Sequence, residues 1–260
     1  MDNREILLSM VNDYSQLEDV AAIVLGGSST AKIADNHSDY DIYIYGEQEP
    51  PVDERRRIAQ KYADYMEIDN HNFETGDVYI LRETSKPVDI MYRTLSSIEA
   101  NIKWVWEECN ASLGYTTCFV DNVNKSEILF DRTGWFKALQ QRTCTPYPEK
   151  LALNIIKKNF AYLKDAMFSF YDQLFSAVKR QDYVSINHRT AAFLASYFDV
   201  IFALNRVMHP GEKQLVRFAL CHCNLLPEDF ARDVDILAMS EAQKRLDKAA
   251  DMVEKLRKII

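Results

Sequence analysis

The sequence predicts an α+β protein, in which a mixed β-sheet domain flanked by helices is followed by an all-helical bundle. Up to about residue 145, short β-branched and aromatic runs alternate with amphipathic helical stretches. Pro146 and Pro148 then interrupt the chain. Beyond these prolines the apolar residues recur at helical spacing. We therefore predict two domains, residues 1–145 and residues 146–260.

The first domain is expected to alternate helices with short strands. Residues 3–18 and 55–67 have the apolar spacing of helices. The runs VAAIVL and DYDIYIY are continuously apolar or alternate in character, as the residues of strands do. Strands are predicted at residues 20–25, 39–45, 77–82, 88–93 and 128–130.

The second domain is expected to hold about five helices. An apolar stripe runs from residue 149 to residue 180 almost without a break, which predicts one long helix. The final helix is predicted to begin at Ser240, with Gln243 completing a capping box. The remaining helices are predicted at residues 183–208, at residues 212–223 and from Pro227 onward.

The composition is that of a globular protein with an acidic surface. The 260 residues carry a formal charge of −8, from 31 basic and 39 acidic side chains. Nucleic-acid-binding proteins usually present a basic face to the phosphates, so a nucleic-acid partner is disfavoured. The run Glu54-Arg55-Arg56-Arg57 is the longest basic cluster, and we interpret it as the solvated face of an exposed helix.

The sequence shows neither a signal peptide at its N-terminus nor an apolar run of about 18–20 residues that would span a membrane. Its five cysteines have no paired spacing, which is typical of reduced thiols. We interpret Cys221-His222-Cys223 as core thiols, because structural zinc requires four ligands. We therefore expect a cytoplasmic protein without a membrane partner.

Three acidic residues are the strongest candidates for chemistry. Asp39 and Asp41 open a predicted strand, and alternation along a strand points both side chains to the same face. Two carboxylates that close repel each other unless a cation lies between them, and magnesium prefers such oxygen ligands. Asp89 interrupts an apolar strand, PVDIMYR, where a carboxylate is costly unless it faces solvent or a cation. Taken alone, each feature also fits an ordinary solvated strand.

A Gly-Gly-Ser-Ser turn, residues 26–29, directly follows the first predicted strand. Glycines there let the backbone approach a ligand, and a helix beginning at the serines would direct free N–H groups toward an anion. An ordinary strand-to-helix turn has the same composition, so the turn becomes specific only together with the carboxylates.

The order of these features resembles the nucleotidyltransferase signature of the DNA polymerase β superfamily. The matching stretches are GGSSTAKIADNHSDYDIYIY and KPVDIMYR, within residues 20–93. The resemblance implies that Asp39, Asp41 and Asp89 are catalytic and hold two Mg²⁺ ions, while the turn grips a nucleoside triphosphate. The chain looks like the minimal and antibiotic nucleotidyltransferases that carry a helical C-terminal domain. The nucleotide-binding residues are then expected to be Gly27, Ser28, Ser29, Lys32 and Lys213.

Some positions depart from the family pattern. Relatives often have Arg or Lys at the positions of Ser29 and Ala31, and Gly at the position of Lys32, so the phosphate clamp is weaker here. In the helical domain, basic and polar residues gather near a predicted helix end and are interpreted either as capping groups or as triphosphate contacts: Asn205, Arg206, His209 and Lys213. His188 and Arg189 are weaker candidates. The three tryptophans, Trp104, Trp106 and Trp135, are interpreted as core side chains.

The leading hypothesis is a magnesium-dependent enzyme that transfers AMP from ATP, or another nucleoside monophosphate, to a hydroxyl group of a small molecule and releases pyrophosphate. The negative charge favours a cationic acceptor, such as an aminoglycoside or lincosamide antibiotic. The alternative is a regulatory or antitoxin-like module that binds a nucleotide or a protein on the same fold. An enzyme that modifies a protein side chain is a third possibility.

Overall fold

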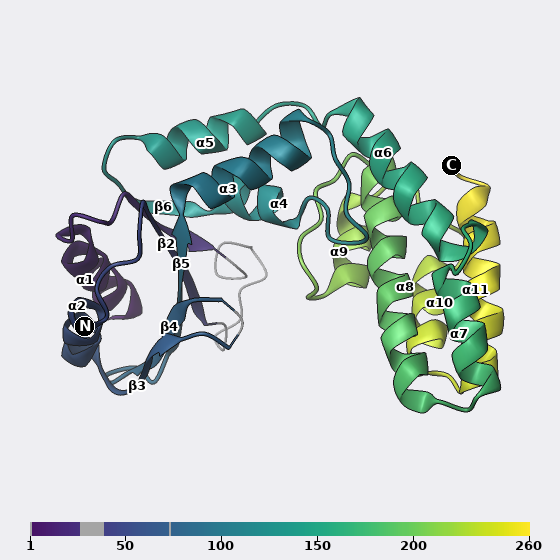
Figure 1. Cartoon of the computed structure of the whole chain (residues 1–260), viewed down its shortest axis with the longest axis horizontal. Helices are drawn as coiled ribbons and strands as arrows, with labels where there is room; N and C mark the ends of the chain where they lie inside the picture. The colour runs from purple at the N-terminus through teal and green to yellow at the C-terminus, as the bar shows by residue number, and fades with distance from the viewer. Residues whose placement is uncertain (1, 27–38, 73) are drawn as a thin grey trace. The chain divides into compact units, whose positions relative to one another are not determined.

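The computed structural model describes residues 2–26, 39–72 and 74–260 (Figure 1). Two compact units are distinguished by their packing. The first comprises the chain up to Lys103 together with Asn122–Thr145, and the second comprises Trp104–Asp121 and Pro146–Ile260. The packing thus assigns residues 104–121, as well as the residues after 145, to the helical unit. The sequence predicts one boundary only, at residue 145.

The first unit is built on a six-stranded mixed sheet with the order β3-β4-β5-β2-β1-β6. The central pair, β2 and β5, is parallel, and the other neighbouring pairs are antiparallel. The strands span Ala22–Gly26 (β1), Tyr40–Gly46 (β2), Ala63–Asn70 (β3), Gly76–Leu81 (β4), Pro87–Thr94 (β5) and Glu127–Asp131 (β6).

Helices cover both faces of this sheet (Figure 1). The helices that lie wholly in the first unit are α1 (Asn3–Ser15), α2 (Val52–Tyr62), α3 (Leu95–Ile102) and α5 (Trp135–Thr143). The boundaries between the units fall within a π-helical turn, Lys103–Glu107, and within α4 (Cys118–Lys125). The α1 helix begins with a capping box between Asp2 and Glu5, as a strong helix start does.

Alternation along the strands divides the side chains between the two faces of the sheet. The even-numbered residues of β2 and β5, such as Ile42 and Ile90, join a buried core with α1 and α2. On the other face, the Tyr45 ring packs against Trp135 and Phe136 of α5, with ring centroids 5.6 and 5.2 Å apart. The odd-numbered residues, which include Asp41 and Asp89, therefore lie on the face that α5 covers in part.

The second unit is helical, and residues 150–260, all of which are described, contain no strand. Its helices are α6 (Glu149–Phe160), α7 (Phe170–Lys179), α8 (Tyr183–Leu204), α9 (Leu215–His222), α10 (Phe230–Met239) and α11 (Ala242–Arg257), with a π-helical turn at Ala161–Asp165. The long α8 supplies Phe193, Tyr197 and Phe202 to the core of the unit. The predicted α+β class with a following helical bundle is confirmed.

No helix in the described part of the chain combines the length and the hydropathy that crossing a membrane requires. Even α8, which has 22 residues, carries Asp199 among its buried side chains.

The predicted long helix over residues 149–180 is wrong. The chain leaves helical geometry before α7, where Phe168 has a left-handed φ of 58°. Ser169 and Asp172 then form a capping box that starts α7 afresh. The capping box predicted at Ser240 is also wrong, because Ser240 ends α10 and α11 starts after Glu241 without a side-chain cap.

The predicted helix over residues 55–67 is correct only as far as Tyr62. From Ala63 the chain forms β3, which pairs antiparallel with β4 at the edge of the sheet. Residues of β3 alternate between exposed and partly buried, and the charged side chains face solvent. An edge strand needs apolar residues on one face only. The apolar residues of β3 were therefore too few to distinguish this strand from the end of a helix.

Candidate active site

Asp41 and Asp89 lie side by side on the two parallel central strands. The register of β2 and β5 pairs Asp41 with Asp89 directly, one residue after the pairing of Tyr40 with Val88. Both side chains are half-buried and both point to the face opposite the α1 and α2 core. Asp39 is exposed immediately before β2 begins. The structure thus brings Asp41 and Asp89 together on one face of the sheet, with Asp39 just before the start of the same strand as Asp41.

The surroundings of Asp89 are electronegative. Partial burial raises the pKa of its carboxyl, and the charges of Glu74 and Asp39 raise it further. A carboxylate that is both desolvated and surrounded by like charges favours either a proton or a cation nearby. The same face therefore has the electrostatics of a cation site.

The donor set fits magnesium in its chemistry, because carboxylate oxygens are the ligands that this ion prefers. Among the residues that the structure describes, however, no three His, Cys, Asp or Glu side chains form a group close enough to hold a metal ion. Asp41 and Asp89 form the in-register pair, and Asp39 lies at the end of the same strand. The role of these three residues as metal ligands remains a prediction.

Gly26 ends β1 directly opposite Asp41. A Cβ atom at this position would lie 2.6 Å from the Tyr43 ring and 3.0 Å from Nδ2 of Asn122, so a larger residue would displace the ring. The glycine therefore lets Tyr43 lie close to the end of β1. The other residues predicted for the turn and for nucleotide binding, Gly27, Ser28, Ser29 and Lys32, lie outside the described residues.

Glu74 and Arg93 form an ion pair on the same face, which sequence reasoning missed. Nε and Nη2 of Arg93 donate to the two carboxylate oxygens of Glu74, both at 2.9 Å. The guanidinium also stacks on Tyr43, with Cζ 4.4 Å from the ring centroid. A signal was available, because Arg93 follows Asp89 by four residues in one strand and therefore shares its face.

The residues of the second unit that the sequence suggested for nucleotide binding, all of which the structure describes, do not form one cluster of contacts. Arg206 forms an ion pair with Glu149, and Asn205 holds the start of the segment after α9 by accepting from the N–H groups of Asn224 and Leu225. Lys213 is exposed in the turn before α9. His188 and Arg189 are exposed on α8. The assignment of Lys213 to nucleotide binding remains a prediction.

His209 is fully buried, unlike its neighbours in sequence. Its ring lies between Tyr115 and Phe202, at centroid distances of 4.7 and 5.0 Å. Nδ1 accepts a hydrogen bond from the N–H of Gly211 at 3.2 Å, which places the proton of the neutral ring on Nε2. Burial lowers the pKa of His209 to about 4, so the ring is neutral at physiological pH.

We expect His209 to make folding sensitive to acid. Its folded pKa of about 4 lies below the value of about 6.5 for an unfolded histidine, so the stability it confers is present above pH 6.5 and is lost as the pH falls toward 4. Relative to His209→Phe, the wild type should lose about 2 kcal/mol between pH 7.5 and pH 5. Urea unfolding of both proteins at the two pH values measures this difference. A difference that does not change with pH would show that the ring titrates normally.

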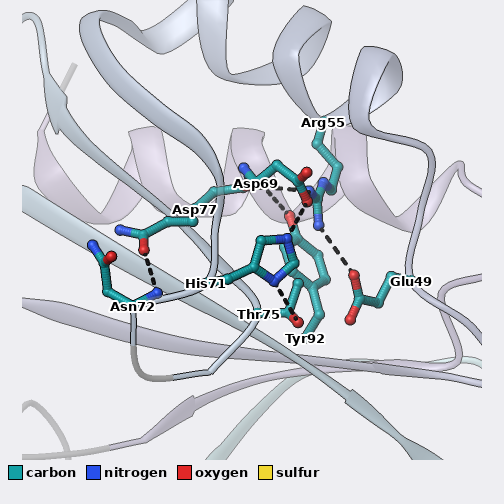
Figure 2. A network of polar contacts seen from close by, with 9 residues as sticks. Glu49, Arg55, Asp69, His71, Asn72, Thr75, Asp77 and Tyr92 are labelled. Atoms are coloured by element: carbon teal, nitrogen blue, oxygen red, sulfur yellow. Dashed lines mark hydrogen bonds and ion pairs between the residues drawn. The ribbon is translucent and has the colours of Figure 1, made fainter.

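Arg55 corrects the interpretation of the basic run as a solvated face. Its side chain is fully buried, whereas Arg56 and Arg57 are exposed. As Figure 2 shows, its guanidinium lies in a polar network on the α2 side of the sheet, where Nη2 donates to Asp69 at 2.8 Å. It also lies 3.6 Å from Asp77, which is fully buried, and 4.5 Å from the centre of the Tyr92 ring.

The tryptophans divide between core and surface. Trp106 is buried, and Trp135 is half-buried and donates to Glu99. Trp104 is 41% exposed, so its assignment to the core is wrong. Cys223 is buried and Cys221 is exposed, so the interpretation of this pair as core thiols holds for Cys223 alone.

Part of the chain, and its fold, have counterparts among known proteins. A family model described as "Domain of unknown function (DUF4037)" matches residues 117–215. No curated protein matches the sequence. The chain is similar to a crystal structure of a nucleotidyltransferase-like protein from Exiguobacterium sibiricum, with 12% identity and a TM-score of 0.47, covering 96% of this chain and 72% of that one.

Proposed function

We propose that the chain is a magnesium-dependent nucleotidyltransferase that transfers a nucleoside monophosphate to a hydroxyl group of a small molecule. The observation that carries the proposal is the direct pairing of Asp41 with Asp89 on adjacent parallel strands. Asp39 precedes the same strand, and its charge acts on Asp89. The sequence signature of a Gly-Gly-Ser turn followed by Asp-x-Asp supports the same class of reaction.

In this proposal Asp39, Asp41 and Asp89 would hold the magnesium ions. The bound ions would neutralise charge on the phosphates and assist an in-line displacement at the α-phosphorus, with pyrophosphate as the leaving group. Asp89, by holding one ion beside the acceptor, would favour removal of the proton from the acceptor hydroxyl. Ser28 and the neighbouring turn residues would bind the β- and γ-phosphates.

The acceptor class follows from charge. A protein with a formal charge of −8 attracts cations, which favours a cationic acceptor such as an aminoglycoside or lincosamide over a nucleic acid. ATP is proposed as the donor, with the other nucleoside triphosphates as alternatives.

The test is an assay of pyrophosphate release with labelled ATP, GTP, CTP or UTP, magnesium and a panel of hydroxyl-bearing acceptors. We expect release that requires both magnesium and an acceptor, together with transfer of the label to that acceptor. A protein that binds magnesium-ATP without any transfer across the panel would instead be the regulatory or antitoxin-like module, which keeps the fold for binding alone.

A further inference from the structure

Arg93 is a partly enclosed cation on the same face of the sheet as the carboxylates. Four residues separate it from Asp89 on β5, so both side chains leave the strand on one side. The Arg93 side chain is 12% exposed, whereas its ion-pair partner Glu74 is 41% exposed. The carboxylate of Glu74 is therefore the more accessible member of the pair.

The Tyr43 ring supports the guanidinium of Arg93 on one side. It stacks on Tyr43, the same-face neighbour of Asp41 on β2, with Cζ 4.4 Å from the ring centroid. The ring in turn packs closely over Gly26, which pairs with Asp41. The stacked guanidinium keeps its planar fork aligned without Glu74, because the aromatic contact comes from the sheet itself.

The proposed triphosphate needs more positive charge than the segment after the first strand supplies, because Lys32 is the one lysine and no arginine occurs between Gly26 and Asp39. At Ser29 and Ala31 the chain lacks the basic residues common in the family it resembles. Asp39, Asp41, Asp89 and Glu74 make this part of the sheet strongly acidic. An arginine on that face offers two parallel N–H donors, and phosphate accepts them with the same bidentate geometry as a carboxylate.

We propose that Arg93 binds a phosphate group of the nucleoside triphosphate, and that the Glu74 carboxylate occupies the place of that phosphate in the free protein. This inference rests on the proposed function and names a residue for its nucleotide site. Glu74 can be replaced because its carboxylate, at 41% exposure, regains hydration when it leaves, and the incoming phosphate then supplies the partner that the largely buried Arg93 requires. Arg93 remains in place on Tyr43 and exchanges one bidentate oxygen pair for another.

The proposal predicts opposite signs for substitutions of the two partners. Arg93→Met should weaken the binding of magnesium-ATP and of inorganic tripolyphosphate by about tenfold or more, since a charge-assisted hydrogen-bonded pair is lost. Arg93→Lys should retain part of the affinity. Glu74→Gln should tighten binding severalfold, because it removes the competing charge. If the pair only fastened the loop that carries Glu74, both substitutions would weaken binding.

Isothermal titration calorimetry with tripolyphosphate in the presence of magnesium measures these affinities on the full chain. Arg56→Met, which removes an exposed arginine of the first unit, is the matched control and should bind as the wild type does. Weaker binding by Glu74→Gln, or wild-type binding by Arg93→Met, would overturn the inference. Should Arg93→Met fail to fold, the sign of the Glu74→Gln effect decides the question.

Failure of the proposed function is distinguishable from failure of this inference. If Arg93→Met weakens and Glu74→Gln strengthens tripolyphosphate binding while no acceptor is modified, the anion site is supported and the proposed transferase activity is contradicted. If the protein transfers the nucleotide but the wild type, Arg93→Met and Glu74→Gln bind tripolyphosphate equally, the transferase activity is supported and the anion site at Arg93 is contradicted. Absence of tripolyphosphate binding by the wild type would remove the anion site as well.

Discussion

Asp41→Asn is expected to lower the rate of pyrophosphate release by roughly 10²- to 10³-fold, because one charge is lost where the transferring phosphoryl group requires neutralisation. The substitution keeps the volume of the side chain. It also removes repulsion between two carboxylates that face each other across β2 and β5, so the unliganded variant should melt at the wild-type temperature or slightly above it. Its stabilisation by magnesium-ATP should shrink.

The measurement compares turnover and melting curves of wild type and variant, with and without magnesium-ATP. Asp53→Asn is the matched control, because Asp53 is an exposed aspartate of the same unit at the start of α2. This control should keep wild-type turnover. Equal turnover in Asp41→Asn and wild type would remove Asp41 from the mechanism.

Arg55→Met is expected to destabilise the protein by about 3–5 kcal/mol, since removal of one partner leaves buried charge without compensation. Asp77 is the group most affected. It is fully buried, and burial already raises the pKa of its carboxyl although Tyr92 and Arg55 act in the opposite direction. Without Arg55, the folded state would hold Asp77 as an anion only at a higher cost.

The pH dependence of this effect has a definite sign. A carboxyl whose folded pKa is raised contributes stability at low pH and loses it as the pH rises through the folded pKa. The variant raises that pKa further, so its penalty should be largest near pH 7.5 and smaller near pH 5. Urea unfolding at both values measures it. Arg56→Met should change stability by less than about 0.5 kcal/mol, and an equal effect of the two substitutions would contradict the role of the network.

The class of the fold could be predicted because each central strand has a strong local pattern. The run DYDIYIY alternates in character along β2, and PVDIMYR places Val88, Ile90 and Tyr92 on the core face of β5. The edge strand β3 was missed because its alternation mixes exposed acidic residues with few apolar ones, which resembles the last turns of α2. No glycine or proline occurs between residues 55 and 70 to mark the change from helix to strand after Tyr62.

The candidate site was predictable in its carboxylates and not in their surroundings. Spacing alone places Asp39 and Asp41 on one strand, and the apolar flanks of Asp89 single it out. The pair of Glu74 and Arg93 depends on the antiparallel pairing of β4 with β5, which brings the residues before Gly76 beside the end of β5. Arg55 shares the helix face of Ile58 and Ala59, three and four residues later, so its position carried a signal. Its burial as a charged side chain depends on tertiary packing, because its partners Asp69 and Asp77 come from β3 and β4.

The path of the backbone between the two units limits how the protein can be divided. Residues 104–121 belong to the second unit but are synthesised before β6 and α5, which complete the first. A nascent chain that ends at Lys103 lacks β6, the strand that borders β1. A fragment that ends at Thr145 retains Gly114 and Thr116 without their hydrogen-bond partners, Asn159 and Asp199. No single truncation point therefore yields either half with its native packing.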